Sequence, residues 1–184
     1  MEVESKVLLE PRDVTTITVR LTELGVNLDR PEIQRDVYYK ERGFRDKVQG
    51  PGSYLVRVRY KQSGTVLNMK RLTNLDGVWD EVETAVDDGK VAEQIVEAIG
   101  AEHAVTVAKE RRKAKDGDLE IIIDVVDGLG TFLELAIETD SDPAQARAKI
   151  DAYLDKLGID KVRVELRGYP TILLEQQGVI FSVK

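Results

Sequence analysis

Charged and apolar residues alternate along most of the strand-like stretches of this sequence, and the pattern begins at its first residues. Glu2, Glu4 and Lys6 stand two positions apart, and Val3 and Val7 occupy positions of the opposite parity. Side chains two apart on a β-strand point to the same face, so this strand would have one charged face and one apolar face. A charged row is costly against an ordinary core, but it suits a place where a metal ion meets a polyanion.

The alternation recurs on later stretches, with both signs of charge in clusters. A solvated outer face is the simplest explanation for any single strand, but the pattern covers most of them. If the strands close into an antiparallel barrel with helices packed outside, the charged rows line its interior. That interior would carry basic residues at Arg57, Arg59, Lys70, Lys109 and Arg111, and acidic residues at Glu2, Glu4, Glu81, Glu83, Asp124 and Glu134.

Such a lining has a chemical meaning. Arginine and lysine at fixed positions bind phosphate oxygens, arginine through two parallel hydrogen bonds. Clustered carboxylates hold Mg²⁺ or Mn²⁺, because these hard cations prefer oxygen ligands. Together these groups are what phosphoryl-transfer chemistry requires. The sequence therefore predicts a metal-dependent site for a polyphosphate.

Strands dominate the expected elements. We expect them at residues 2–9, 34–41, 53–60, 65–71, 78–84, 104–114, 119–126 and 132–139, and Asp116-Gly117 is a strong hairpin signal. Helices are expected at about 12–25, at 89–99, from Pro143 to 157 behind Asp142 as N-cap, and near 170–176. Their apolar stripes are Val14, Ile17, Leu21 and Leu24; Val91, Ile95 and Ile99; and Ile150, Tyr153, Leu154 and Leu157. The polar loop 42–52 is a candidate mobile lid.

Composition excludes several classes of protein. The 184 residues most simply form one domain, 1–184, and the net charge of −7 argues against nucleic-acid binding driven by overall charge. With no cysteine there are no disulfides, thiolate zinc sites or cysteine nucleophiles. No apolar run approaches the roughly 20 residues of a membrane helix, and the first residues do not resemble a signal peptide. We therefore expect a soluble cytoplasmic protein with no membrane partner.

Six sequence elements, in order along nearly the whole chain, resemble the CYTH superfamily, also called triphosphate tunnel metalloenzymes. The Glu2-x-Glu4-x-Lys6 opening is the signature of that family. The other elements are Gln34-Arg35-Asp36-Val37-Tyr38-Tyr39, Leu55-Val56-Arg57-Val58-Arg59 with Asn68-Met69-Lys70, Glu81-Val82-Glu83, Lys109-Glu110-Arg111-Arg112, and the run from Asp124 through Gly128-Leu129-Gly130 to Glu134. The second and last of these are similar to the class IV adenylyl cyclase branch.

The resemblance implies an eight-stranded antiparallel β-barrel, a mainly β (α+β) fold with helices outside, and Mg²⁺- or Mn²⁺-dependent chemistry on a triphosphate. It implies that Glu2, Glu4 and Glu134 are metal ligands, and that Asp124, Glu81 and Glu83 are further ligands or tune the site. It implies that phosphates are held by Lys6, Arg57, Arg59, Lys70, Lys109 and Arg111. Glu4, Glu134 and Lys6 are the residues expected to act in catalysis.

Two positions depart from the family pattern. Ala136 stands where the family often has a second glutamate, so the presence of a second metal is in question. Gly168 replaces a serine of the C-terminal S-Y-x-x-L-L element, which removes a hydroxyl that could cap the last short helix.

Three functions agree with this pattern. The first is cyclisation of ATP to cyclic AMP and pyrophosphate, and the second is hydrolysis of tripolyphosphate, thiamine triphosphate or a nucleoside triphosphate. The third is a non-catalytic polyphosphate-binding module. The cyclase-like elements favour the first, with hydrolysis close behind it. The expected partner is a small triphosphate substrate, and a homodimer is the commonest assembly for a chain of this kind.

Overall fold

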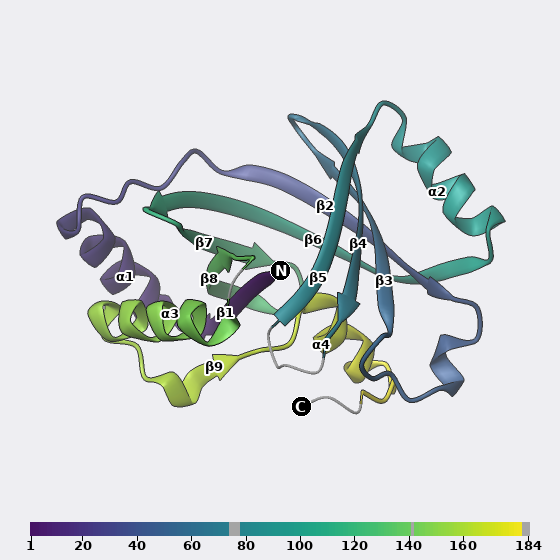
Figure 1. The fold of residues 1–184 in the computed structure, drawn as a ribbon. Coiled ribbons are helices and arrows are strands. Elements are labelled where there is room, and N and C mark those ends of the chain that lie inside the picture. The colour runs from purple at the N-terminus through teal and green to yellow at the C-terminus, as the bar shows by residue number, and fades with distance from the viewer. Residues whose placement is uncertain (74–77, 141, 182–184) are drawn as a thin grey trace. The chain divides into compact units, whose positions relative to one another are not determined.

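The structure, a computed structural model, describes residues 1–73, 78–140 and 142–181 (Figure 1). Within these residues the strands are β1 (Glu2–Leu9), β2 (Glu32–Glu41), β3 (Tyr54–Lys61), β4 (Gly64–Leu72), β5 (Val78–Val86), β6 (Ala101–Asp116), β7 (Leu119–Val126), β8 (Gly130–Glu138) and β9 (Val164–Glu165). The helices are α1 (Pro11–Glu23), α2 (Gly89–Ala98), α3 (Pro143–Leu157) and α4 (Tyr169–Gln176), with short 3₁₀ turns η1 (Phe44–Asp46) and η2 (Lys161–Arg163).

The strand order is β5-β4-β3-β2-β6-β7-β8-β1-β9, and neighbouring strands run antiparallel wherever their register is given. The expected fold class, a closed eight-stranded antiparallel barrel with helices outside it, is therefore confirmed. All eight expected strands are present, and β9 is an addition that the sequence pattern did not predict. The predicted hairpin at Asp116-Gly117 joins β6 to β7, with Gly117 at a φ of 63°.

The described chain divides into two compact units. Unit 1 comprises Met1–Glu32 and Lys109–Leu166, and unit 2 comprises Ile33–Ala108 and the chain from Arg167 onward. The expectation of a single domain over residues 1–184 stays a prediction.

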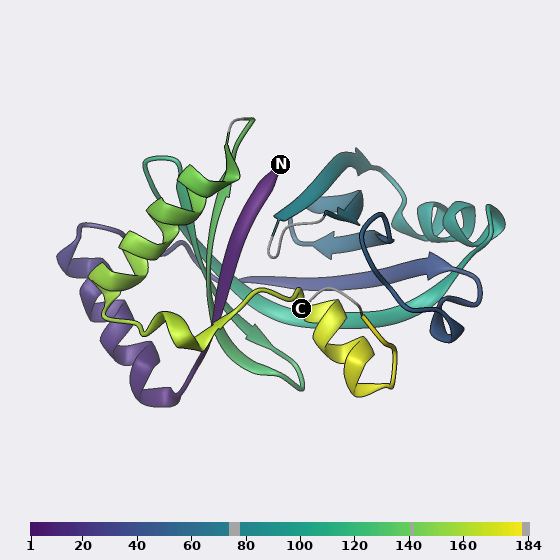
Figure 2. The same cartoon turned by 60° about the horizontal axis from the view of Figure 1, so that its bottom comes forward.

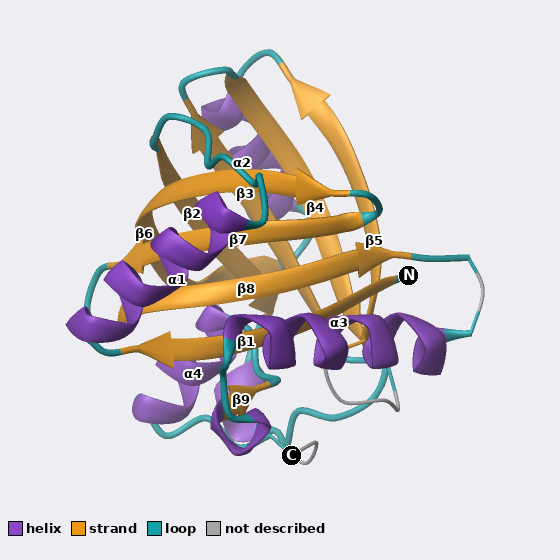
Figure 3. Cartoon of the chain, turned by 90° about the vertical axis from the view of Figure 1, so that its left-hand side faces the viewer, coloured by secondary structure: helices purple, strands orange, loops and turns teal. Residues whose placement is uncertain are grey.

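In unit 1, helices α1 and α3 lie side by side, and α3 packs on β1 and β8 (Figure 3). The predicted stripe of α3 is confirmed, because Ile150, Tyr153, Leu154 and Leu157 are all buried. The helix starts where expected, with the Asp142 side chain accepting a hydrogen bond from the backbone N–H of Ala144. These contacts fix the position of α3 against β1.

In unit 2, α2 packs against β3 and β4 (Figure 2). Its start approaches the sheet closely, since a Cβ added to Gly89 would lie 2.6 Å from a ring carbon of Tyr60. Tyr39 Oη donates to the Glu93 carboxylate of α2 at 2.7 Å, and Tyr60 Oη donates to the same carboxylate. The helix is therefore held by a close backbone approach and a shared carboxylate.

The predicted stripe of α2 is wrong. Val91, Ile95 and Ile99 are exposed, whereas Gly89, Ala92 and Val96 are the buried positions. The close approach of Gly89 to Tyr60 turns the face with Ala92 and Val96 toward the sheet, so the predicted stripe points elsewhere. The stripe of α1 is confirmed at Ile17 and Leu21, but Leu24 at its end is exposed.

The N-terminus of the last helix lacks a side-chain cap, as its sequence predicts. α4 begins after Gly168, and no side chain caps that end. The replacement of the family's serine by glycine therefore has the consequence expected from the sequence. None of the described helices is long and apolar enough to cross a lipid bilayer.

Leu154 offers a test of the packing of α3. It is fully buried, so Leu154→Ala should lower the free energy of unfolding by about 3–5 kcal/mol, through lost burial and a cavity. Leu24→Ala, at a leucine that is 44% exposed, should lower it by much less. Urea denaturation of the two variants measures both values, and equal losses would contradict the packing described for α3.

Candidate functional site

Most of the charged residues singled out in the sequence are buried. Glu4, Lys6, Arg57, Lys109, Arg111, Asp124 and Glu134 are each at most 7% exposed. Because they are buried, they do not belong to a solvated outer face. Charged side chains are almost never buried unless they are paired, so these residues need partners inside the protein. They form two groups, one in each unit. The unit 1 cluster is Glu2, Glu4, Lys6, Lys109, Arg111, Asp124 and Glu134; the unit 2 cluster is Arg57, Arg59, Lys70, Glu81 and Glu83.

Lys6 joins two carboxylates of the unit 1 cluster. Its Nζ lies 2.5 Å from Oε1 of Glu4 and 3.4 Å from Oε2 of Glu134. The register of the strands explains the second contact, because Lys6 on β1 stands directly opposite Glu134 on β8. The structure thus brings together the three residues expected to act in catalysis.

Arg111 extends this group to Asp124. Arg111 Nε donates to Asp124 Oδ1 at 2.7 Å, Nη2 contacts the other carboxylate oxygen, and Nη2 also lies 3.6 Å from Oε1 of Glu134. Asp124 is fully buried and both of its oxygens bind Arg111. This geometry favours a role in orienting Arg111, and the assignment of Asp124 as a metal ligand stays a prediction.

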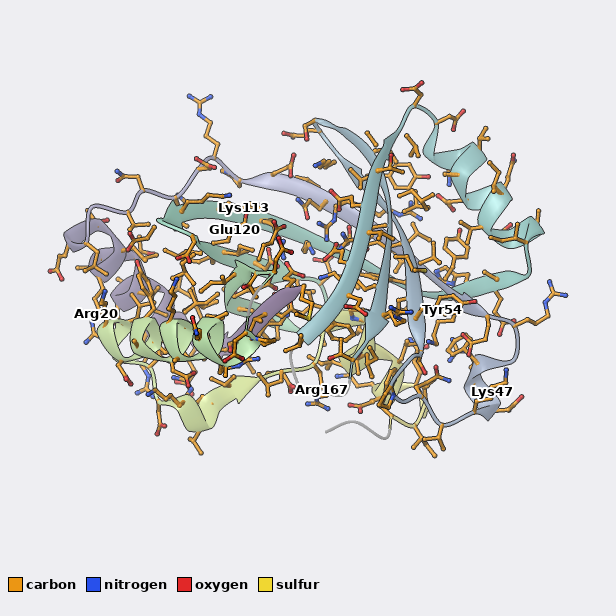
Figure 4. All side chains as sticks on the ribbon, viewed as in Figure 1. Arg20, Lys47, Tyr54, Lys113, Glu120 and Arg167 are labelled. Atoms are coloured by element: carbon orange, nitrogen blue, oxygen red, sulfur yellow. The ribbon has the colours of Figure 1, made fainter. Side chains whose placement is uncertain are left out.

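An exposed ion pair on the same two strands shows the contrast. Lys113 Nζ lies 3.3 Å from Oε2 of Glu120, and the two side chains are 42% and 30% exposed (Figure 4). Such surface pairs contribute little to stability. The buried pairs differ because every charge in them has left water, so each partner is needed to hold the other.

The remaining members of the unit 1 cluster lie on the same strands. Lys109 is 4% exposed on β6, two residues before Arg111, so their side chains share a face. Glu2 is partly exposed near the start of β1, opposite Glu138 of β8. Their assignments to phosphate and to metal stay predictions.

The donor set of unit 1 fits a divalent cation. Among the described residues, no three histidine, cysteine, aspartate or glutamate side chains are grouped as a ready metal site. Glu4 and Glu134 nevertheless present two buried carboxylates around one ammonium. Mg²⁺ is commonly held by one or two carboxylates together with substrate phosphates and water, so two protein ligands suffice.

The unit 2 cluster centres on Arg57. Its Nη2 lies 3.5 Å from Oε1 of Glu81 and 3.4 Å from Oε2 of Glu83, and Lys70 Nζ lies 3.0 Å from Oε2 of Glu81. Within the part of the chain that the structure describes, Nε of Arg57 is buried and has no hydrogen-bond partner. Arg57 also shares a side-chain hydrogen bond with Tyr38, so its Nε is the donor that remains for a further acceptor.

Arg59 is held more firmly. Its Nε and Nη2 each donate to one oxygen of Asp36 at 2.7 Å, and Asp36 is fully buried. This pair repeats in unit 2 the arrangement of Arg111 with Asp124 in unit 1. Asp36 stands in a sequence motif but had no predicted role. Its position, two residues before Tyr38 on the charged face of a strand, was the available signal.

Two further residues of unit 2 were missed. Tyr38 shares the face of Asp36 and is buried; burial and the nearby Asp36 carboxylate raise the pKa of its phenol. Asn68 is 2% exposed and donates its side-chain amide to Glu81. Asn68 therefore helps to place the carboxylate that also contacts Arg57 and Lys70.

Lys40 is a buried cation for which the sequence pattern predicted no role. It is 1% exposed, and its Nζ donates to the backbone carbonyl of Tyr54 at 2.7 Å (Tyr54 is labelled in Figure 4). The nearest carboxylate given for it is Glu41, at 3.9 Å. Burial lowers the pKa of the Lys40 ammonium, although Glu41 acts in the opposite direction.

The loop at 42–52 covers Lys40 and is anchored at two points. Phe44 is fully buried and its ring lies 6.0 Å from Lys40 Nζ, and Gln49 is 1% exposed. Gln49 Nε2 donates to the carbonyl of Phe44 at 2.9 Å. The loop is thus packed in this structure, and its opening as a lid stays a prediction.

Comparison with known proteins identifies the family. The model of the CYTH domain matches residues 1–169, so this chain belongs to the CYTH family. A protein of Methanocaldococcus jannaschii named "Putative adenylate cyclase" is 28% identical over 139 residues, which cover 73% of this chain and 75% of that protein.

Solved structures agree with the fold. A protein of Pyrococcus horikoshii OT3 superposes with a TM-score of 0.78 at 25% identity, covering 93% of this chain and 98% of the other. A Hippeastrum protein, described as a putative adenylyl cyclase with a dominant triphosphatase activity, superposes with a TM-score of 0.67 over 100% of this chain and 99% of the other. It is 17% identical, so this likeness shows the fold alone.

Lys40 gives a prediction for the pH dependence of stability. Its folded-state pKa lies below the value of about 10.4 expected when unfolded, so between these two values only the unfolded state holds the proton. The free energy of unfolding should therefore rise as pH increases through that window. Lys40→Met lacks this rise, so the difference in stability between the two proteins should change in favour of the wild type toward pH 10.

Urea denaturation from pH 7 to pH 10.5 measures this difference. Lys115→Met is the matched control, because the Lys115 side chain is 72% exposed and its removal should leave the wild-type profile unchanged. A constant difference between wild type and Lys40→Met across the range would contradict the burial cost assigned to Lys40.

Proposed function

We propose that this member of the CYTH family is a divalent-metal-dependent enzyme acting on a triphosphate, most simply as a class IV adenylyl cyclase. The ribose 3′ oxygen of ATP would attack the α-phosphorus, the 3′ hydroxyl would lose its proton, and pyrophosphate would leave. The relative from Methanocaldococcus jannaschii, whose name refers to adenylate cyclase, supports this choice of reaction.

The observation that carries the proposal is the state of Arg57. A buried guanidinium normally forms short hydrogen bonds on all sides, because an unmade buried bond costs about 1–3 kcal/mol. Arg57 shares a side-chain hydrogen bond with Tyr38, but its carboxylates lie at 3.4 and 3.5 Å and its buried Nε has no partner among the described residues. An anionic oxygen is the ligand that completes such a group, and phosphate oxygens match the planar guanidinium.

The carboxylates divide by their surroundings. Glu4 and Glu134, with Glu2 beside them on β1, are proposed to hold Mg²⁺ or Mn²⁺, which when bound would neutralise phosphate charge. Asp124 and Asp36 are each occupied by an arginine and would fix its direction. Glu81 and Glu83 contact Arg57, and Glu81 also contacts Lys70, so they tune these cations.

The cations would bind the polyphosphate. Arg59 and Arg111 are held by aspartates on one side and can present their remaining donors to phosphate oxygens. Arg57, Lys70 and Lys109 would spread the rest of the charge. Lys6 lies between the two proposed metal ligands and would either contact a phosphate or ease loss of a proton from the nucleophile.

Hydrolysis of a triphosphate is the second candidate. Both reactions need the same clamp and differ in which phosphorus is attacked and by which oxygen. The Hippeastrum protein, with its dominant triphosphatase activity, shares the fold and supports keeping this candidate. A binding module without catalysis is disfavoured, because each of the family's expected charged groups other than the one replaced by Ala136 is present.

Product analysis tests the reaction directly. Purified protein with Mg²⁺ or Mn²⁺ is given ATP, thiamine triphosphate and tripolyphosphate side by side. Cyclic AMP with pyrophosphate establishes the cyclase. Orthophosphate without a cyclic nucleotide establishes the hydrolase, and no turnover of any of the three would overturn the proposal of an enzyme.

Glu4→Gln should abolish metal-dependent turnover, because the amide removes a charged ligand while keeping its shape. The fold should persist, as judged by circular dichroism. Glu110→Gln is the matched control and should keep full activity, because Glu110 is exposed and stands between Lys109 and Arg111 on β6, so its side chain points to the opposite face. Wild-type turnover in Glu4→Gln would remove Glu4 from the metal site.

Lys70→Ala should lower kcat/KM on the order of tenfold to a hundredfold, because a charge-assisted hydrogen bond contributes about 1.5–3 kcal/mol. Arg71→Ala is the control: Arg71 is the next residue of β4, lies on the opposite face, and its side chain is 54% exposed. Steady-state kinetics of both variants decides the point, since equal effects would mean that Lys70 does not contact the substrate.

A further inference from the structure

Arg147 of α3 reaches the backbone of β1 at the residue proposed to bind metal. Its Nη1 donates to the carbonyl oxygen of Glu4 at 2.9 Å and also contacts the hydroxyl of Ser5. Ser5 is 1% exposed, so these contacts lie in the packed layer between helix and strand. Arg147, Glu4 and Ser5 all belong to unit 1.

The contact lies on the side of β1 away from the charged row. Successive side chains on a strand point to opposite faces, so Ser5 faces away from the side chains of Glu4 and Lys6. The guanidinium therefore holds the peptide unit that joins Glu4 to Ser5. It acts on the carboxylate through the backbone, which makes it a positioning residue.

The contact lies close to a strand pairing of the same unit. β9 pairs with β1 at Lys6 and Val7, and α3 supplies a donor two residues earlier, at Glu4. A charged donor to a carbonyl forms one of the stronger hydrogen bonds in proteins. This hydrogen bond fixes the direction of the backbone at the residue from which the Glu4 side chain projects.

The helix that carries Arg147 is rigidly placed. Ala146, its neighbour in the sequence, is 4% exposed, and Ile150 is fully buried one turn later. A side chain presented from a packed helix can hold a site within the small tolerance that ligand binding requires. Arg147 thus has both the contact and the support that a positioning role demands.

We propose that Arg147 sets the direction of the Glu4 carboxylate, and with it the ammonium of Lys6, for binding of the divalent cation. The proposal rests on the proposed function, since it takes Glu4 as a metal ligand. Groups that orient ligands from outside the coordination sphere typically contribute about 10–100-fold to metal affinity.

Isothermal titration calorimetry of the intact protein with Mn²⁺ alone tests this proposal, and it requires no turnover. Arg147→Met keeps an unbranched apolar stem and removes the guanidinium donors, so Mn²⁺ affinity should fall by about 10–100-fold. Arg147→Lys should recover part of the loss. Ser5→Ala should cost less, because the contact to the Glu4 carbonyl remains.

Lys149→Met is the matched control on the same helix. Lys149 forms an exposed pair with Asp118 at 2.5 Å and has no contact to Glu4 among those described. It should bind Mn²⁺ as the wild type does. Wild-type affinity in Arg147→Met, or an equal loss in Lys149→Met, would overturn the positioning role.

The same titrations separate this inference from the proposed function. If the wild type binds Mn²⁺ and Glu4→Gln does not, the metal role of Glu4 stands, whatever Arg147→Met shows. If the wild type binds no Mn²⁺, both proposals fail together at their shared premise. Should Arg147→Met not fold, Arg147→Gln takes its place, and unchanged Mn²⁺ affinity in that variant would contradict the inference.

Discussion

The cost of removing charges from water governs this structure. A carboxylate or ammonium buried alone is strongly unfavourable, whereas pairs and chains of pairs are tolerated when each group has partners. In unit 1, Lys6, Glu134, Arg111 and Asp124 form such a chain, and in unit 2 Arg59 with Asp36 and Arg57 with Glu81 and Glu83 do the same. The apolar faces of the same strands pack under the helices. The same alternation of residues therefore places the paired charges on one face of each strand and the core residues on the other.

The sequence predicted the strands because period-two alternation is a strong signal and both kinds of residue obeyed it. It placed Lys6 and Glu134 at one site, but it did not predict the ion pair between them. It could not predict which partner each charge takes. Asp124 was expected near a metal and lies against Arg111, because register and side-chain reach decide pairing, and neither is visible in spacing alone.

The errors on α2 and Lys40 share a cause. The helical spacing of α2 allows more than one apolar stripe, and the close approach at Gly89 places this residue, with Ala92 and Val96, on the side that faces the sheet. Val91 and Ile95 therefore lie on other faces of the helix and remain exposed. Lys40 passed unnoticed because it continues a charged row, and only the packing of Phe44 above it shows that its ammonium is buried. Tertiary contacts override local pattern in both places.

Lys6 also changes what it means for the proposed site to bind a metal. Glu4 and Glu134 share the ammonium of Lys6, which offsets part of their mutual repulsion. If these carboxylates hold the divalent ion as proposed, Lys6 would no longer be their main counter-charge. The displaced ammonium would then need a new anionic neighbour, and the nearest one supplied by the reaction is the substrate itself. Metal and triphosphate would in this way favour each other's binding through a single lysine.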